Sequence, residues 1–457
     1  MNPHIILICI DALRADCLRE PGTDSIWAGT GRPATPALDR LASSSRVFSN
    51  VQAASSWTKP SMPSVFLSLH PSEHGVLEVA KGAHGAALST SLPGSVATLP
   101  ELLAAGGYRT IGLAHNAQLD PALGFSRGFD VFSSDAGDGD AILERVQTLD
   151  PFGGDAPGFL YLHFIEPHWP YGKRIARRAN REACGRFPFH RFKASQWKAL
   201  KLDLKRGHVS LTDDEVRFLR WVYRLAVEEA DRAVGRFLEW LDSSGALERS
   251  VVLVTADHGE ELLDHGLVGH GQSLHEELVR VPLLLRIGRD TGLPRPVDRD
   301  TCDDPVGHVD VLPTLAEAAG VTFSSSVSGR SLLNGAGAEH VFSEVKHKRR
   351  YHQAVRDRRY KLIRSYFFRR AKESDAAEDY NNLDALFADR PFRQERRLYD
   401  LRRDPAETEN LAAVRPDVAD RLESVLEEWW RGLKRHRTDS LDLEAVMIRR
   451  LEALGYL

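Results

Sequence analysis

Short apolar runs alternate along the chain with segments whose apolar residues recur every three or four positions. The runs that we expect to form core strands cover residues 4–10, 109–114, 159–164, 251–256 and 282–287. Uninterrupted apolar strands that alternate with helices are typical of a mostly parallel sheet with helices on both faces. The pattern therefore predicts an α/β fold, a three-layer sandwich around one central sheet.

The clearest helix is predicted to begin after Thr212. The sequence Thr212-Asp213-Asp214-Glu215 is a capping box, in which the Thr and Glu side chains bond to free backbone amides of the first turn. Apolar residues then recur at helical spacing from Val216 to Leu241, which predicts one buried stripe. We expect this helix to belong to the core and assign it no chemistry.

The pattern changes near residue 335, which predicts two domains, 1–335 and 336–457. Residues 353–356 and 359–363 alternate between polar and apolar positions, as antiparallel strands do. The end of the chain has a helical pattern. We therefore expect a large α/β domain followed by a small C-terminal α+β subdomain.

The composition is that of a globular protein with a large core. Of the 457 residues, 42% are hydrophobic and 27% are charged, which excludes a disordered chain and a fibrous repeat. The 60 basic and 64 acidic side chains give a net charge of −4, so no overall field favours nucleic acid or an anionic membrane. The four cysteines are scattered, which favours a reducing compartment over a disulfide framework.

Two stretches, 172–211 and 345–403, are locally rich in Arg and Lys. Most of these charges are expected to lie on a solvated surface. The alternative for the first stretch, which follows a predicted strand, is a lid that holds an anionic substrate over the strand ends.

From the sequence we expect neither a signal peptide nor a membrane span. The apolar run 5–10 is too short for the core of a signal peptide and is followed at once by Asp11 and Arg14. No apolar stretch reaches the roughly 20 residues with which a helix crosses a bilayer. We therefore expect a cytoplasmic protein with no membrane span.

Polar side chains follow four of the predicted strands, at the points where those strands end. In chain order these are Asp11, His115-Asn116, Glu166-Pro167-His168 and Asp257-His258. Ligand sites of open parallel sheets lie at this edge, and buried carboxylates and imidazoles need partners. A divalent cation would satisfy several of them together, so the pattern predicts a metal site.

The hydroxyl group of Thr58 could complete this site. Pro60 suits the first position of a helix, and Ser61 and Ser64 favour the same first turn, so we expect Thr58 at the positive end of a helix. Metal coordination would lower the pKa of the hydroxyl and make it a nucleophile. The alternative from the local sequence is that Thr58 only caps the helix.

Two carboxylates, an imidazole and a hydroxyl form a mixed oxygen and nitrogen site. Such a site suits Mn²⁺, Mg²⁺, Ca²⁺ or Zn²⁺, and the imidazole of His258 favours Mn²⁺ or Zn²⁺ over Ca²⁺. No thiolate is near, so a closed structural zinc site is not expected.

In their order along the chain, these residues resemble the sulfatase family of the alkaline phosphatase superfamily. Each matching motif is weak by itself, but together they cover nearly the whole chain in the right order. The motifs lie at residues 10–16, 35–42, 57–76, 107–110, 128–130, 166–171, 255–260, 269–271, 280–283, 308–315, 359–363 and 398–411. The resemblance implies an alkaline phosphatase-like fold.

The resemblance also implies a metal centre with one divalent ion, for which Mn²⁺ is favoured and Mg²⁺, Zn²⁺ and Ca²⁺ are alternatives. The implied ligands are Asp11, Thr58, Asp257 and His258.

A small anionic ester is the substrate that the resemblance implies, with Thr58 as the nucleophile. His168 and His270 would contact its non-bridging oxygens or protonate the leaving group. Asn116 and Lys59 would also contact the substrate.

Four other polar residues are expected to have no part in the chemistry. Asp310 lies in a helix-start pattern and is expected to be structural, and His163 lies in a strand and is expected to be a core histidine. His265 and His275 are expected to be solvent-facing or structural.

The chain departs from the sulfatase pattern at three positions. Sulfatases oxidise a Cys or Ser to formylglycine, but Thr58 occupies that position, and its branched Cβ could give only a ketone. We therefore expect no formylglycine. Met62 stands where the family has an Arg, and Ala12 stands where it has a second Asp, so the metal site loses one carboxylate.

A threonine nucleophile also occurs in relatives such as lipoteichoic acid synthases, phosphoethanolamine transferases and nucleotide pyrophosphatases. The Asp-His pair followed by Gly-His-Gly is similar to phosphonate monoester hydrolases. The leading hypothesis is thus a metal-dependent hydrolase or transferase of phosphate, phosphonate or sulfate esters, with phosphorus favoured. The sequence leaves the oligomeric state open.

Two other hypotheses stay open. The first is a catalytically inactive sulfatase-like protein that binds an anionic ligand or a protein partner, which the changes at Ala12, Thr58 and Met62 motivate. The second is an ordinary sulfatase in which Ser56 or Ser61 is modified, although neither serine has the required sequence context.

Overall fold

The computed structural model describes most of the chain. The described residues are 2–18, 25–27, 30–78, 80–81, 87–169, 171, 173–182, 194–295, 300–323, 327–333, 337–347, 349–368, 383–388, 391–438, 440–443 and 445–453.

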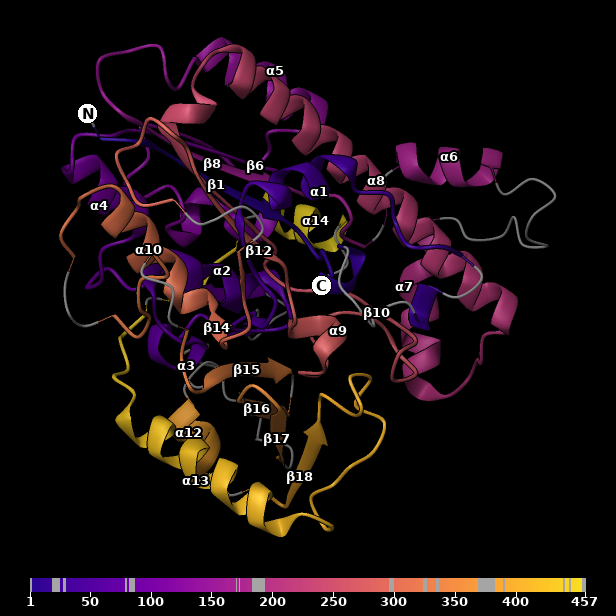
Figure 1. Cartoon of the computed structure of the whole chain (residues 1–457). Coiled ribbons are helices and arrows are strands. Elements are labelled where there is room, and N and C mark those ends of the chain that lie inside the picture. Colours follow the sequence, from indigo (N-terminus) through magenta and orange to yellow (C-terminus); the bar gives the residue numbers. More distant parts are fainter. Residues whose placement is uncertain are drawn as a thin grey trace.

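The predicted α/β fold is confirmed by a central sheet of eight described strands (Figure 1). In spatial order these are β13 (Thr301–Cys302), β2 (Arg46–Phe48), β12 (Leu283–Ile287), β9 (Ser250–Thr255), β1 (His4–Ile10), β8 (Gly158–Phe164), β6 (Arg109–Ala114) and β7 (Val131–Ser133). All five predicted strands are among them, within one residue of the predicted ends.

Strand β1 lies in the middle of the sheet and pairs in parallel with β8 and β9. All seven of its residues are buried, because neighbouring strands flank it and helices cover it. Strand β12 runs antiparallel to β9, so the sheet is mostly, not wholly, parallel. The carboxyl ends of β1, β6, β8 and β9 therefore meet at one edge.

Two groups of helices cover the two faces of the sheet (Figure 1). On one face, α1 (Pro36–Ser43), α5 (Gly139–Leu149) and α6 (Lys173–Glu182) pack on α8 (Asp213–Ser243). On the other face, α2 (Thr58–Leu67), α4 (Leu99–Ala105) and α10 (Val311–Ala318) pack on one another.

Helix α8 begins where the sequence predicts. Oγ1 of Thr212 accepts a hydrogen bond from the amide of Glu215 over 3.3 Å, and Oε2 of Glu215 accepts one from the amide of Thr212 over 2.9 Å. The predicted apolar stripe is buried from Leu219 to Leu241, while Val216 at its start is half-buried. The capping box thus fixes the start of the helix that packs along the sheet.

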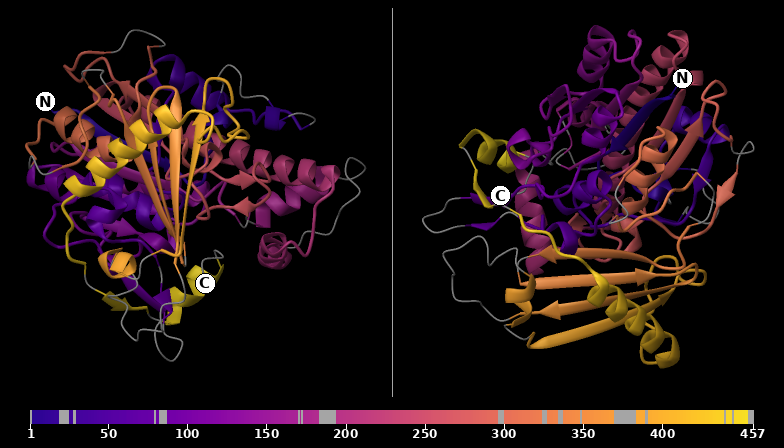
Figure 2. Two further views of the ribbon diagram at one scale, coloured as in Figure 1. Left: turned by 90° about the horizontal axis from the view of Figure 1, so that it is seen from below. Right: turned by 90° about the vertical axis from the view of Figure 1, so that its left-hand side faces the viewer.

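A second, antiparallel sheet lies beside the large one (Figure 2). Its strands are β15 (Val341–His347), β16 (Arg350–Arg356), β17 (Tyr360–Phe367) and β18 (Arg393–Asp400). Helix α13 (Pro416–Gly432) packs on one face of this sheet, and its Leu422 and Leu426 are fully buried there. On the other face, Val345 and Ile363 join the main core.

Beyond α13 the chain returns to the large domain. Strand β19 (Ser440–Asp442) pairs with β5 (Ala87–Thr90), and α14 (Ala445–Ala453) places the fully buried Leu451 in the main core. Nη2 of Arg450 donates to the carbonyl oxygen of Ser134 over 2.7 Å. The predicted division into 1–335 and 336–457 stays a prediction, since residues 334–336 lie outside the described ones.

Several shorter elements complete the described fold. They are β3 (Val51–Gln52), α3 (Pro71–His74), β4 (Ala80–Lys81), α7 (Ala194–Arg206), β10 (Glu261–Leu262), β11 (Val268–Gly269), α9 (Glu276–Val279), β14 (Val306–Gly307) and α12 (Leu383–Ala388).

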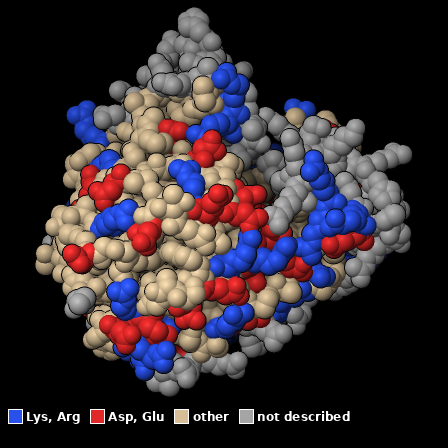
Figure 3. All heavy atoms as spheres, turned by 90° about the horizontal axis from the view of Figure 1, so that it is seen from above, with Lys and Arg blue, Asp and Glu red and all other residues tan. Residues whose placement is uncertain are grey.

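Positive and negative side chains are interspersed on the face of the molecule that Figure 3 shows. This agrees with the nearly balanced charge of the sequence. Among the described helices, none combines the length and the apolar character that a bilayer crossing requires.

Candidate active site

Two carboxylates follow neighbouring strands in the middle of the sheet. Asp11 follows β1 and Asp257 follows β9, and both side chains are completely buried. Oδ1 of Asp11 and Oδ2 of Asp257 each lie 3.5 Å from Nε2 of His258. The structure therefore brings three of the four predicted metal ligands together.

The tautomer of His258 follows from its other contact. Nδ1 of His258 lies 2.8 Å from the carbonyl oxygen of Gly259, which can only accept a hydrogen bond. Nδ1 therefore carries the proton, and Nε2 has a free lone pair. That lone pair faces the two carboxylates.

Thr58 is the first residue of α2, and its hydroxyl lies in the same cluster. Oγ1 of Thr58 is 3.4 Å from Nε2 of His258. Because α2 begins at Thr58, Pro60 is the third helical residue, not the first as predicted. Its side chain still suits this position, since the first amides of a helix have no partner within it. Thr58 thus sits at the positive end of the helix, as predicted.

Asn116 follows β6 and contacts both Asp11 and Thr58. Its Nδ2 donates to Oδ2 of Asp11 over 2.7 Å and lies 3.4 Å from Oγ1 of Thr58. Its Oδ1 accepts from the amide of Gln118 over 2.8 Å, which assigns the amide orientation. Asn116 therefore lies beside the predicted nucleophile, with its N–H groups directed into the cluster.

His163, which the sequence suggests is an ordinary core histidine, belongs to this cluster. It is fully buried, but its Nε2 lies 3.0 Å from Oδ2 of Asp11, and its Nδ1 lies 2.8 Å from the hydroxyl of Tyr161. One signal could have found it. In a parallel pairing of β1 and β8, His163 stands opposite Cys9, whose side chain points to the same face as that of Asp11.

The polar cluster fits a divalent cation. Oδ1 of Asp11 and Oδ2 of Asp257 have no hydrogen-bond partner among the described residues, although both are buried. Burial, together with the charge of Asp257, raises the pKa of Asp11 well above its ordinary value. A cation would offset this cost, because it would accept lone pairs from both carboxylates and from Nε2 of His258.

Three imidazoles meet beside the carboxylates. The ring centre of His258 lies 4.4 Å from that of His270, and His270 lies 4.7 Å from His168. Burial and the neighbouring imidazoles hold the pKa of His168 well below its ordinary value, and burial and His258 do the same for His270. Both predicted proton donors are therefore neutral in the free protein at pH 7.

Glu260, which sequence reasoning did not single out, orients His270. Its Oε1 lies 3.1 Å from Nδ1 of His270, and burial raises the pKa of the Glu260 carboxyl to about 7. This contact fixes the orientation of the His270 ring, with Nε2 on the side away from Glu260.

Ser61 and His308 form the rear of the cluster. Oγ of Ser61 donates to the carbonyl oxygen of Asp257 over 2.6 Å, and Nδ1 of His308 lies 2.9 Å from the same hydroxyl. Nε2 of His308 donates to the carbonyl oxygen of Ala256 over 2.9 Å. These contacts hold the start of the Asp257–His258 turn, which gives Ser61 a structural role.

The positions that depart from the sulfatase pattern have other contacts. Ala12 has a φ of 58°, and its backbone amide donates to Oδ1 of Asp257 over 3.2 Å. The sulfur of Met62 packs 3.9 Å from that of Cys9. The ammonium of Lys59 donates to the hydroxyl of Ser89. The predicted substrate contact of Lys59 stays a prediction.

The remaining candidates lie outside the cluster. Asp310 accepts hydrogen bonds from the amides of Gly307 and Arg330, over 2.9 and 2.8 Å, which is a structural role as predicted. His275 is buried and stacks on the partly buried His265, with ring centres 3.7 Å apart. A solvent-facing position was thus wrong for His275, because its Nδ1 is within hydrogen-bond distance of a buried carboxylate.

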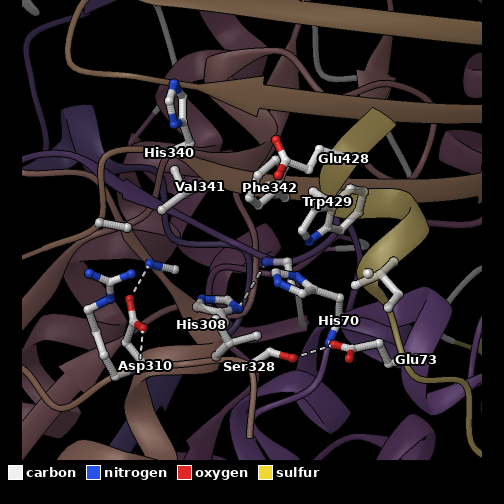
Figure 4. Close-up of a pocket in the computed structure, with 17 residues that line it drawn as sticks. His70, Glu73, His308, Asp310, Ser328, His340, Val341, Phe342, Glu428 and Trp429 are labelled. Atoms are coloured by element: carbon white, nitrogen blue, oxygen red, sulfur yellow. Dashed lines mark hydrogen bonds between the residues drawn. The ribbon is translucent and has the colours of Figure 1, made fainter. Parts of the chain in front are cut away.

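A cavity of about 340 Å³ lies on another side of α2 (Figure 4). Its wall includes His70, His308, Phe342 and Trp429, which come from both domains of the predicted division. It does not include Thr58, so we assign it no part in the chemistry.

Comparison with protein families gives a match over most of the chain. A family described as Sulfatase matches residues 3–321. Arylsulfatase K of Xenopus laevis is 29% identical over 194 residues, which are 39% of this chain and 35% of that protein. The multifunctional alkaline phosphatase superfamily protein PehA of Trinickia caryophylli is 27% identical over 207 residues, 42% of this chain and 39% of that protein.

The matched regions thus span well under half the length of these relatives. Among solved structures, the fold is similar to a phosphonate monoester hydrolase from Silicibacter pomeroyi, with a TM-score of 0.64 and 19% identity. That similarity covers 94% of both chains and concerns the fold alone.

Proposed function

We propose, since the chain belongs to the sulfatase family, that it is a metal-dependent ester hydrolase or transferase with Thr58 as its nucleophile. The proposed substrates are small anionic esters, with phosphate and phosphonate esters favoured over sulfate esters. The names of its relatives, an arylsulfatase and an alkaline phosphatase superfamily protein, support an ester substrate.

The position of Thr58 carries this proposal. Its hydroxyl is the first side chain of a buried helix and contacts His258 and Asn116 at 3.4 Å each. Trp57, not Thr58, occupies the cap position of α2, so a simple capping role does not account for the position of the Thr58 hydroxyl.

Asp11, Asp257 and His258 would hold the divalent ion, next to the oxygen of Thr58. Two carboxylates and one imidazole favour Mn²⁺, with Mg²⁺, Zn²⁺ and Ca²⁺ as alternatives. When bound, such an ion lowers the pKa of a neighbouring hydroxyl and stabilises negative charge on the transferred group.

With the residues around Thr58, the reaction would proceed in two steps. Oγ1 of Thr58 attacks the phosphorus, the bond to the leaving oxygen breaks, and an ester of Thr58 forms. The amide N–H of Asn116 is placed to donate to an oxygen near Oγ1. In the second step, water or an acceptor alcohol cleaves this ester. Cleavage by water would make the protein a hydrolase, and cleavage by an alcohol would make it a transferase.

His168 and His270 are placed to supply the proton of the leaving oxygen. Both rings lie within contact distance of each other beside His258, and both are neutral in the free protein. A bound anion raises the pKa of a nearby imidazole. Binding of the substrate would therefore charge one of the rings when its proton is needed.

Phosphorus is favoured over sulfur for a chemical reason. Sulfatases release sulfate from formylglycine by breaking down a hydrated aldehyde, which needs two oxygens on one carbon. Thr58 has one oxygen, so the covalent ester must be cleaved by attack at the transferred atom itself.

The test is a panel of aryl phosphate mono- and diesters, phosphonates and sulfates, assayed with each of the four metal ions. Thr58→Ala should reduce turnover of the best substrate by about 10³-fold or more. Thr58→Ser keeps the hydroxyl and should retain part of the activity. Circular dichroism and metal binding control for loss of the fold.

Full activity of Thr58→Ala would refute the covalent mechanism. A folded wild-type protein that binds metal and anions but turns over none of the esters would instead support the inactive, ligand-binding alternative.

A further inference from the structure

Helix α7 brings a lysine from the basic segment 172–211 to the catalytic cluster. The helix contacts β11, the short strand that precedes His270. The ammonium of Lys201 donates to the carbonyl oxygen of His270 over 3.3 Å. The lid alternative for this segment stays a prediction.

Gly269 gives the ammonium room to lie there. A Cβ on residue 269 would be 2.6 Å from Nζ of Lys201, well inside contact distance. Gly269 also has a φ of 86°, in the region that favours glycine. The turn before His270 is therefore built so that the lysine can pack directly on its backbone.

The charge of Lys201 reaches the centre of the site. It faces the carboxylates of Glu260 and Glu261, and it is one of the groups that lower the pKa of both His168 and His270. Its ammonium is therefore near the two imidazoles that the proposed function places at the leaving oxygen.

A site that transfers a phosphoryl group needs positive charge around the non-bridging oxygens. Met62, which stands where the family has an Arg, brings no charge to the site. One N–H of the Lys59 ammonium bonds to Ser89. Lys201 comes from a different part of the chain than either of these residues.

We infer that Lys201 binds the non-bridging oxygens of the substrate and favours esters with two negative charges over esters with one. This inference rests on the proposed function and adds a specificity-determining residue to the same site. It predicts phosphate monoesters as the preferred substrate class, ahead of phosphodiesters, phosphonate monoesters and sulfates. Lys201 keeps its contact with the His270 carbonyl oxygen and uses its other N–H groups for the substrate.

The test compares Lys201→Met with Lys205→Met in the wild-type background. Lys205 lies one helical turn further along α7, where its ammonium contacts His347 at 2.9 Å, so it controls for loss of a charge on this helix. The substrates are para-nitrophenyl phosphate, a dianion at about pH 8, and two monoanions, bis-para-nitrophenyl phosphate and para-nitrophenyl sulfate.

Lys201→Met should reduce kcat/KM for the dianion about tenfold more than for the monoanions. Lys205→Met should change kcat/KM for all three substrates by the same small factor. Lys201→Arg keeps the charge and should keep the preference for the dianion. A role of Lys201 only in holding His270 would lower all three activities equally, and that result would overturn the inference.

Equilibrium binding of inorganic phosphate separates this inference from the proposed function. If Thr58→Ala is fully active, the covalent mechanism fails, while weaker phosphate binding by Lys201→Met still supports the anion contact. If Lys201→Met binds phosphate as well as the wild type does, the inference fails even when the Thr58 mechanism holds.

Discussion

Nε2 of His163 lies 3.0 Å from Oδ2 of Asp11, although His163 belongs to an apolar strand, near its carboxyl end. The tyrosine hydroxyl of Tyr161 lies 2.8 Å from the other ring nitrogen. If the hydroxyl donates to Nδ1, Nε2 carries a proton and donates to the carboxylate. The ring therefore orients the first carboxylate of the candidate metal centre from within the sheet.

His163→Phe should weaken metal binding while keeping the fold. Phenylalanine fills the same buried space but cannot donate to Asp11, and loss of such an orienting hydrogen bond reduces metal affinity by about 10- to 100-fold. Calorimetric titration with Mn²⁺ measures the change. Tyr161→Phe, which removes only the second contact of the ring, should have a smaller effect. Equal Mn²⁺ affinities for His163→Phe and the wild type would contradict this role.

Replacing Lys59 by methionine should stabilise the protein. Lys59 is fully buried, and burial lowers the pKa of its ammonium to about 7, although the charge of Glu78 opposes this effect. Replacing a buried charge by an apolar side chain of similar shape removes the cost of burying that charge. The free energy of unfolding should therefore rise by about 1 kcal/mol or more.

The stability gained by Lys59→Met should depend on pH, and the direction of that dependence follows from the lowered pKa of Lys59. The folded protein binds the proton of Lys59 more weakly than the unfolded chain, so the cost is full below about pH 7 and disappears as the pH rises above 10.5, the ordinary value. Urea denaturation of Lys59→Met and the wild type at several pH values measures the difference between their free energies of unfolding. A loss of kcat/KM in the folded variant would support the predicted substrate contact instead.

Glu407 should contribute stability that acid removes. Lys361, which is fully buried, lies 3.1 Å from one oxygen of Glu407, and Nδ1 of His275 lies 3.1 Å from the other. Burial alone would raise the pKa of Glu407, but Lys361 and His275 outweigh it and lower the pKa from 4.5 to about 2. This difference corresponds to about 3 kcal/mol at pH 7.

Because the pKa is lowered on folding, the contribution is present above about pH 4.5 and is lost as the pH falls toward 2. Glu407→Gln should therefore be less stable than the wild type at pH 7, and the two free energies of unfolding should converge in acid. Asp417→Asn, at an exposed carboxylate, is the matched control. Parallel curves for Glu407→Gln and the wild type would show that the ion pair contributes nothing.

The sequence predicts the sheet well, because each core strand is an apolar run with a clear end. Asp11, Asp257 and His258 could be placed together for the same reason, since parallel strands bring their carboxyl ends to one edge. The helix start at Thr58 was displaced by two residues relative to Pro60, because a proline fits any of the first helical positions that lack an amide partner.

Other parts of the site depend on contacts between distant segments. His163 reads as a core residue until the register of β1 and β8 is known. Glu260 and His308 act through hydrogen bonds that no spacing in the sequence reveals. Lys201 lies in a segment whose basic residues are expected from the sequence mostly on a solvated surface, with a lid as the alternative. Its place beside His270 follows from how α7 packs on β11.

The return of β19 and α14 to the large domain also bears on how the protein is made. Leu451 fills a position in the main core, next to residues that emerge from the ribosome hundreds of residues earlier. Domains generally fold as units during synthesis, beginning from the amino terminus. Here the main core is complete only after translation has passed α14, because Leu451 belongs to it.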